Sequence, residues 1–212
     1  MRLHEERLSI DGPAGAIELI VEDPGTPRGI ALVMHPHPLF AGTHTNKVTQ
    51  TLARTFSRLG YVSVRPNFRG VGKSAGEHDE GRGETDDMLA VVAAIKARYG
   101  ELPVALAGFS FGAYVATRVA QAFAAANQPA QGLVLVGTAV GRAAGARDYA
   151  IEHIAKDTVV IHGSADENVP LANVLTWAEA LDLPVIVVAG ADHFFHRRLQ
   201  LIGDIVTRAW RH

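Results

Sequence analysis

The chain has 212 residues, of which 48% are hydrophobic and 20% charged, a formal net charge of −2 and no cysteine. This length and composition are typical of a globular protein with a large buried core, and we expect residues 1–212 to form one domain. The charge balance offers no electrostatic footprint for nucleic acid or an anionic membrane. The lack of cysteine excludes disulfides, thiolate nucleophiles and Cys-ligated zinc.

The N-terminal residues show no export signal and predict a β-hairpin. The first ten residues, MRLHEERLSI, are charged throughout and lack the apolar segment of a secretory signal, so we expect a cytoplasmic protein. Residues 6–22 contain two short strand patterns around a turn at Asp11-Gly12-Pro13, which predicts an antiparallel hairpin.

From residue 29 onward, short apolar runs alternate with segments of helical periodicity. The expected strands are residues 29–34, 61–65, 104–107, 133–136, 158–162 and 185–188. The expected helices are residues 44–59, a helix from about Thr85 to Gly100, the segment from Gly112 to Asn127, and residues 171–181 and 197–210. Such alternation is typical of a parallel sheet covered on both faces, so the sequence predicts an α/β protein with a three-layer α/β/α sandwich.

Two details of this arrangement depend on local signals. Thr85 suits the N-cap of its helix, with Asp86 and Asp87 in the first turn, where the helix dipole favours acids. Residues 138–156 lack clear periodicity and are expected to be irregular. This segment is too short to form a lid domain.

A serine flanked by glycines follows the third of these strands. The turn GFSFG at residues 108–112 leads into an alanine-rich helix, and its two glycines let strand and helix pass close together. Such a turn lifts the Ser110 hydroxyl out of the sheet and points the first helical N–H groups toward an oxyanion formed beside it. The apolar stretch 104–127 is not expected to span a membrane, because Arg118 and Gln121 interrupt it.

The ends of two later strands provide a base and an acid. The carboxyl ends of parallel strands meet at one edge of a sheet, and ligands bind there. Asp166 follows the strand at 158–162 and His193 follows the strand at 185–188, so both are expected beside Ser110. His193 would accept the serine proton, and Asp166 would fix the tautomer of the imidazole. The rival acids are Glu167, Asp192 and Asp148.

An oxyanion hole requires two backbone N–H donors. Phe111, which directly follows the serine, supplies the first. The second is expected from the loop after residues 29–34, where the two prolines have no N–H to give. Leu39 is our first candidate for this donor and Phe40 the second.

Five stretches within residues 35–195 carry a family resemblance. They are HPHPLFAGT with Asn46-Lys47-Val48, PNFRGVGKSAGE, GFSFGA, IHGSADENVP and GADHFF. These stretches resemble the α/β-hydrolase superfamily, and more narrowly its small lidless bacterial hydrolases related to dienelactone hydrolase and carboxylesterases. The resemblance implies the α/β-hydrolase fold without a lid domain, and a serine-hydrolase triad at Ser110, Asp166 and His193. Dienelactone hydrolase has a cysteine where this chain has Ser110, so its lactone chemistry is not implied.

Other motifs predict neither a cofactor nor a metal. The stretch GVGKS at residues 70–74 lacks the first glycine of a phosphate-binding loop, because position 67 is Asn. The histidines His35, His37 and His44 do not have the spacing of a metal site, and no Glu stands at H-E-x-x-H spacing.

Together these patterns predict a serine hydrolase that cleaves a carboxylic ester of a small or medium apolar substrate through an acyl-Ser110 intermediate. We expect Phe40 and Phe194 to line an apolar acyl or alcohol pocket. The expected partner is a small-molecule ester, with no role for nucleic acid or a membrane. Two alternatives stay open: a thioesterase or amidase with the same triad, and a non-catalytic binding or scaffold protein with this fold.

Overall fold

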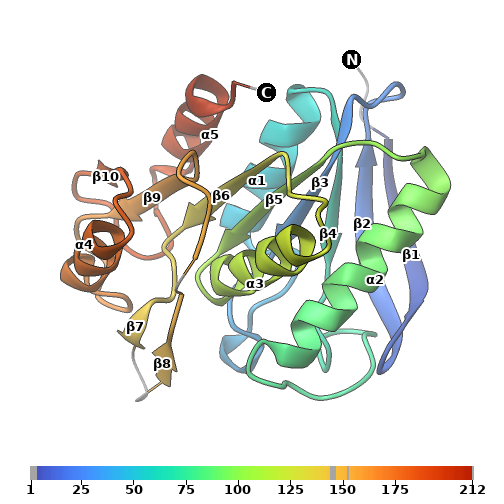
Figure 1. Ribbon diagram of the computed structural model, residues 1–212, viewed down its shortest axis with the longest axis horizontal. Helices are drawn as coiled ribbons and strands as arrows, with labels where there is room; N and C mark the ends of the chain where they lie inside the picture. Colours follow the sequence, from blue (N-terminus) through green and yellow to red (C-terminus); the bar gives the residue numbers. More distant parts are fainter. Residues whose placement is uncertain (1–3, 144–146, 152, 212) are drawn as a thin grey trace.

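An eight-stranded sheet forms the centre of the protein, shown in Figure 1 as a computed structural model that describes residues 4–143, 147–151 and 153–211. Its strands are β1 (His4–Gly12), β2 (Gly15–Asp23), β3 (Gly29–Met34), β4 (Tyr61–Pro66), β5 (Val104–Phe109), β6 (Gly132–Val136), β9 (Val159–Gly163) and β10 (Val185–Val188). The helices are α1 (Lys47–Arg58), α2 (Arg82–Tyr99), α3 (Phe111–Ala125), α4 (Leu171–Ala180) and α5 (Leu199–Ala209), with a short 3-10 helix, η1 (Pro38–Phe40).

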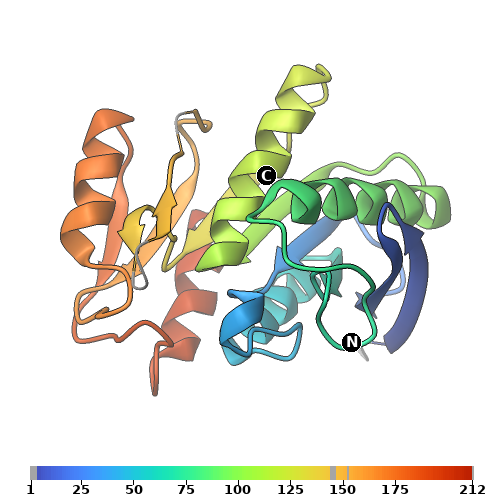
Figure 2. The ribbon, with the colours of Figure 1, turned by 90° about the horizontal axis from the view of Figure 1, so that it is seen from below.

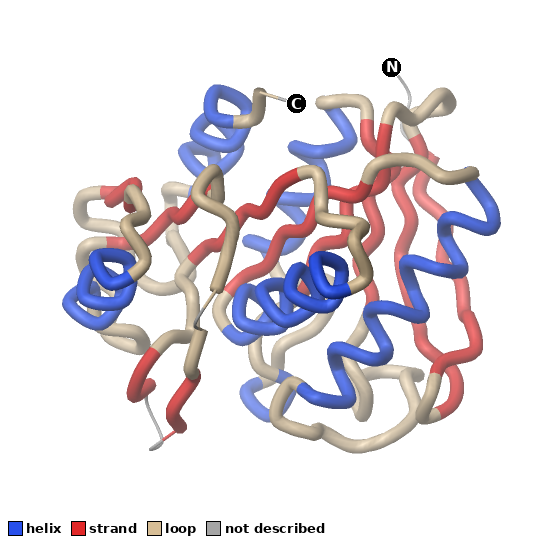
Figure 3. Tube along the Cα trace, viewed as in Figure 1, coloured by secondary structure: helices blue, strands red, loops and turns tan. Residues whose placement is uncertain are grey.

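The strands lie in the order β1-β2-β4-β3-β5-β6-β9-β10. β1 pairs antiparallel with β2, and β2 pairs antiparallel with β4. All neighbouring strands from β4 to β10 are parallel, and Figure 3 shows them as a twisted band between the helices. The predicted α/β fold, a mostly parallel sheet with an antiparallel N-terminal hairpin, is confirmed.

Helices cover both faces of the sheet, which makes the three layers visible in Figure 2. On one face, α2, α3 and α4 bury residues such as Val91, Val115 and Val174 in one hydrophobic cluster. On the other face, α1 and α5 bury Leu52 and Ile202 in a second cluster. Because both faces are covered, central strands such as β3 and β5 are buried at every position, which accounts for their unbroken apolar sequences. No helix in the described ranges has the length and hydropathy that a membrane span needs.

The predicted start of α2 at Thr85 is wrong. The helix begins at Arg82, and the Glu84 carboxylate in its first turn accepts the Gly81 N–H at 2.8 Å. Thr85 lies inside the helix, where its hydroxyl donates to the Gly81 carbonyl. The Asp87 carboxylate instead pairs with the Arg69 guanidinium through two hydrogen bonds of 2.8 and 2.9 Å. Asp86 and Asp87, the acids that suggested a helix start, therefore lie about one turn after the true start of α2.

The segment at residues 138–156, predicted to be irregular, contains two short strands. β7 (Gly141–Ala143) and β8 (Arg147–Tyr149) pair antiparallel in a small separate sheet. Three-residue strands are too short to produce a periodic sequence pattern. Tyr149, at the end of β8, is 8% exposed and belongs to the same hydrophobic cluster as α2, α3 and α4.

The loops that follow β3, β5, β9 and β10 all lie at the carboxyl edge of the parallel strands. In order, they contain η1, the Ser110 turn, Asp166 and His193. The sheet therefore places the predicted site residues on one edge, although Ser110 and His193 are 83 positions apart in the sequence.

Candidate active site

Ser110 occupies a sharp turn between β5 and α3. Its φ of 56° and ψ of −118° lie in a region that non-glycine residues rarely adopt. A Cβ added at Gly108 would collide with the backbone of Gly112, and a Cβ at Gly112 would collide with the carbonyl oxygens of Met34 and His35. The two glycines are therefore required by the close passage of α3 over the ends of β5 and β3.

His193 connects the serine to the acid. Its Nε2 lies 3.0 Å from Ser110 Oγ, and its Nδ1 lies 2.7 Å from Asp166 Oδ2. Both His193 and Asp166 are 6% exposed. When the proton of the neutral imidazole is on Nδ1, the Nδ1–H donates a hydrogen bond to the carboxylate, and Nε2 is left as an acceptor for the serine hydroxyl. The structure thus brings the three predicted residues together in the relative positions of a nucleophile, a base and an orienting acid.

The turn after β9 holds the Asp166 carboxylate in place. Its Oδ1 accepts the N–H groups of Asn168 at 2.9 Å and Val169 at 2.8 Å, which leaves Oδ2 for His193. The buried side chain of His162 lies behind it, with Nε2 3.5 Å from Oδ2 and donating to the Val169 carbonyl at 3.0 Å. Burial lowers the pKa of His162, so this imidazole is neutral and packs behind the carboxylate while its Nε2 bonds to the Val169 carbonyl.

The rival acids do not occupy this position. Asp192 Oδ2 lies 2.6 Å from Nδ1 of His196 on the surface of the protein, and Glu167 is exposed. The side chain of Asp148 lies outside the described residues.

The structure places the predicted oxyanion donors in different surroundings. Phe111 is the first residue of α3, so its N–H belongs to the helix terminus beside Ser110. Leu39 and Phe40 differ from Phe111 because both of their N–H groups already donate to His37. The Leu39 N–H donates to the Nδ1 atom at 3.2 Å, and the Phe40 N–H donates to the carbonyl oxygen at 3.1 Å. The turn of η1 thus engages both predicted second donors, and the geometry does not support either of them.

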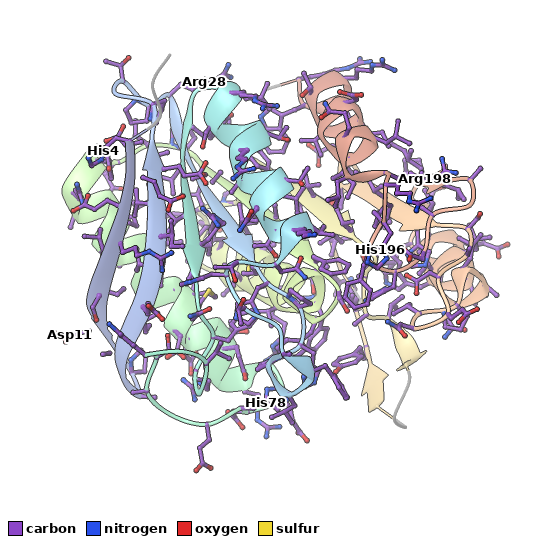
Figure 4. All side chains as sticks on the ribbon, turned by 180° about the vertical axis from the view of Figure 1, so that it is seen from behind. His4, Asp11, Arg28, His78, His196 and Arg198 are labelled. Atoms are coloured by element: carbon purple, nitrogen blue, oxygen red, sulfur yellow. The ribbon has the colours of Figure 1, made fainter. Side chains whose placement is uncertain are left out.

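The loop before η1 is fixed from two sides. His35 is fully buried; its Nε2 accepts the Phe68 N–H at 2.9 Å and its Nδ1 donates to the Pro36 carbonyl at 2.6 Å. Burial lowers the pKa of His35 to about 3, so this imidazole is neutral and can make both bonds. On the other side, His78 lies beside η1 (Figure 4), and the centroid of its ring is 4.7 Å from the centroid of the His37 ring.

A cavity of about 410 Å³ opens next to Ser110 and His193. Phe40 and Phe194, the two residues predicted to form a pocket, both line it and are 64% and 44% exposed. Its wall also contains His37, Asn46, Tyr149 and Asn168, and none of the described residues that line it is Asp, Glu, Lys or Arg. In the described part of the chain, no three His, Cys, Asp or Glu side chains are grouped to hold a metal ion.

Comparison with known proteins identifies the family. Residues 26–156 match the family model described as serine aminopeptidase, S33. The chain belongs to this family of α/β serine hydrolases. A crystal structure of a lidless α/β serine hydrolase from Xanthomonas campestris is 35% identical, with a TM-score of 0.85 over 99% of this chain and 94% of that one. An α/β serine hydrolase homologue from Coxiella burnetii is 36% identical, with a TM-score of 0.82 over 96% of each chain.

Two further relatives of this α/β serine hydrolase are matched over only part of their length. A lysophosphatidylserine lipase of Gallus gallus is 36% identical over 122 residues, which are 57% of this chain and 31% of the lipase. An uncharacterised protein of Rickettsia prowazekii is 38% identical over 115 residues, which are 53% of this chain and 48% of that protein. Each alignment thus spans less than half of the relative.

Several residues of this α/β serine hydrolase site were not predicted from the sequence. His162 lies within a strand, where a histidine gives no sign of the carboxylate behind it. Asn46 lies inside the helix predicted at residues 44–59, whereas in the structure it is the N-cap of α1 and lines the cavity. Tyr149 and Ala139 lie in the segment without periodicity.

The buried His35 of the hydrolase should make its stability depend on pH. In the unfolded chain His35 binds a proton near its ordinary pKa of 6.5, whereas in the folded protein it does so only near 3. Between these values the unfolded state holds more protons, so the free energy of unfolding falls as the pH drops, by up to about 1.4 kcal/mol per pH unit for this group. Urea denaturation at pH 4, 5, 6 and 7 measures the slope.

The matched variant is His35→Gln, which keeps a donor and an acceptor but does not titrate. Its free energy of unfolding is expected to be lower than that of the wild type at pH 7, with a shallower slope between pH 6 and pH 4. Equal slopes in the two proteins would contradict the neutral buried state of His35.

Proposed function

We propose that the protein hydrolyses uncharged carboxylic esters of small or medium apolar molecules through an acyl-Ser110 intermediate. The observation that carries this proposal is the hydrogen-bonded chain Ser110–His193–Asp166 at the wall of an apolar cavity. A Ser hydroxyl is a weak nucleophile without a base, and His193 is within hydrogen-bond distance of it.

The steps follow from these contacts. His193 Nε2 accepts the Ser110 proton while Oγ attacks the ester carbonyl carbon, and the imidazolium that forms is stabilised by the Asp166 carboxylate. Collapse of the tetrahedral intermediate breaks the bond to the alkoxy oxygen, and His193 returns the proton to this leaving group. Water then repeats the sequence on the acyl-enzyme and releases the acid and free Ser110.

For the oxyanion we propose the N–H of Phe111 together with that of His37. Phe111 supports the proposal as the first residue of the helix after Ser110. His37 follows β3 more closely than Leu39 does, has a backbone N–H where Pro36 has none, and lines the cavity.

The cavity wall favours an uncharged substrate. An aminopeptidase must hold a free ammonium group, and a lysophosphatidylserine headgroup carries an anionic phosphate. Either would need an opposite charge to replace its hydration. The described lining residues offer no carboxylate and no Lys or Arg, whereas their phenylalanine and aliphatic groups suit an acyl or alkyl chain.

Ser110→Ala should lower kcat for p-nitrophenyl butyrate by about a million-fold, because the acyl intermediate can no longer form. Ser9→Ala, an exposed serine on β1, is the control and should stay within twofold of the wild type. The same acyl group presented as an ester, a thioester and an anilide shows which bond is cleaved. A Ser110→Ala protein with wild-type activity would refute the mechanism.

Phe40 and Phe194 should set the preferred chain length. We expect kcat/KM to rise along p-nitrophenyl esters from acetate to octanoate, since each added methylene buries more apolar area against these rings. Phe40→Ala and Phe194→Ala should each flatten the series, whereas Leu175→Ala, a similarly exposed residue on α4, should not. If kcat/KM of the wild type does not change along the series and neither Phe substitution alters it, Phe40 and Phe194 do not form the substrate pocket.

A further inference from the structure

Asn46 has an orientation that the fold fixes. It is the N-cap of α1, and its Oδ1 accepts the N–H of Val48 at 2.9 Å and the N–H of Thr49 at 3.3 Å. Only the carbonyl oxygen of a carboxamide can accept these hydrogen bonds, so the oxygen and nitrogen of Asn46 are not interchangeable. The cap therefore assigns Oδ1 to the helix and leaves Nδ2 with two N–H donors to place elsewhere.

Asn46 is also one of the residues that line the cavity containing Ser110 and His193. Asn46 is partly exposed to solvent. Among the described residues, no group accepts a hydrogen bond from its Nδ2. A bound substrate would displace water from this donor. An unpaired N–H in a dry cavity is unfavourable, whereas an N–H paired with a substrate oxygen is not.

The surroundings limit the group that this donor can recognise. The cavity wall is mostly apolar, and the described residues that form it include no Lys or Arg to assist in binding an anion. A neutral oxygen acceptor, such as an ether, hydroxyl or keto oxygen, matches one amide donor without a buried charge.

We propose that Asn46 is a specificity-determining residue that selects esters carrying a neutral oxygen in the acyl or alcohol part, beyond the scissile ester group. Its Nδ2 donates a hydrogen bond to that oxygen, while its Oδ1 continues to cap α1. The inference rests on the proposed function of the site and narrows its substrate class.

Two variants separate the donor from the cap. Asp and Ser cap helices about as well as Asn. Asn46→Asp therefore keeps the size and the cap acceptor of the side chain but loses the amide donor. Asn46→Ser keeps a cap and removes the carboxamide without adding a charge. Thermal melting of both variants should agree with that of the wild type within a few degrees, which shows that α1 is intact.

Two pairs of substrates of equal shape test whether Asn46 Nδ2 donates a hydrogen bond to the substrate. In each pair an ether oxygen replaces one methylene: p-nitrophenyl 3-methoxypropanoate against p-nitrophenyl pentanoate for the acyl side, and 2-methoxyethyl acetate against butyl acetate for the alcohol side. The quantity measured is the ratio of kcat/KM for the ether ester to kcat/KM for its alkyl partner. It is compared between the wild type and each variant.

We expect this ratio to fall about tenfold in both variants for at least one pair, mainly through a higher KM for the ether ester. Ratios that stay within twofold for both pairs would overturn the inference. So would an equal loss on ether and alkyl esters, because Asn46 would then act on the scissile group or on the fold.

The outcome also distinguishes this inference from the proposed function. Alkyl-ester cleavage by the wild type that disappears in Ser110→Ala upholds the proposed function, whatever happens at Asn46. If the wild type cleaves none of the four esters in a Ser110-dependent way, the proposed function fails and the inference about Asn46 fails with it.

Discussion

The close passage of α3 over the ends of β3 and β5 is the constraint on which the site depends. No Cβ fits at Gly108 or at Gly112, and Ser110 between them is held at a positive φ. The packing of buried apolar strands and helices stabilises this strained turn, since a strained residue persists only where its surroundings determine it. The turn holds the Ser110 hydroxyl at the sheet edge and, at the same time, places the first N–H of α3 beside it.

The remaining site groups are positioned by turns that are themselves held by local hydrogen bonds. Two backbone N–H groups fix one oxygen of Asp166, and neutral His162 lies behind the other. The loop after β3 is secured by the two hydrogen bonds of neutral His35. Two buried histidines thus act as neutral hydrogen-bonding side chains, and their desolvation keeps them in that state at neutral pH. His193, in contrast, contacts the serine.

The sequence was informative where long-range order follows from a simple rule. Ser110, Asp166 and His193 each follow a buried apolar strand, and the ends of parallel strands share an edge, so their meeting was predictable. Local hydrogen bonding was not. The second oxyanion donor was assigned to Leu39, but η1 turns its N–H onto the side chain of His37. The predicted start of α2 at Thr85 is wrong because Asp79 accepts the Gly83 N–H in the first turn, and Glu84 accepts the N–H groups of Asp79 and Gly81 just before the helix.

The central claim is that Ser110 is a nucleophile activated by His193, and a fluorophosphonate probe followed by intact-mass analysis tests it most directly. The probe phosphonylates an activated serine and does not depend on the choice of substrate. The account predicts one adduct per folded chain, mapped to Ser110 by peptide mass and formed far more slowly in His193→Ala. A folded protein that gains no adduct, or gains one at a residue other than Ser110, would contradict it.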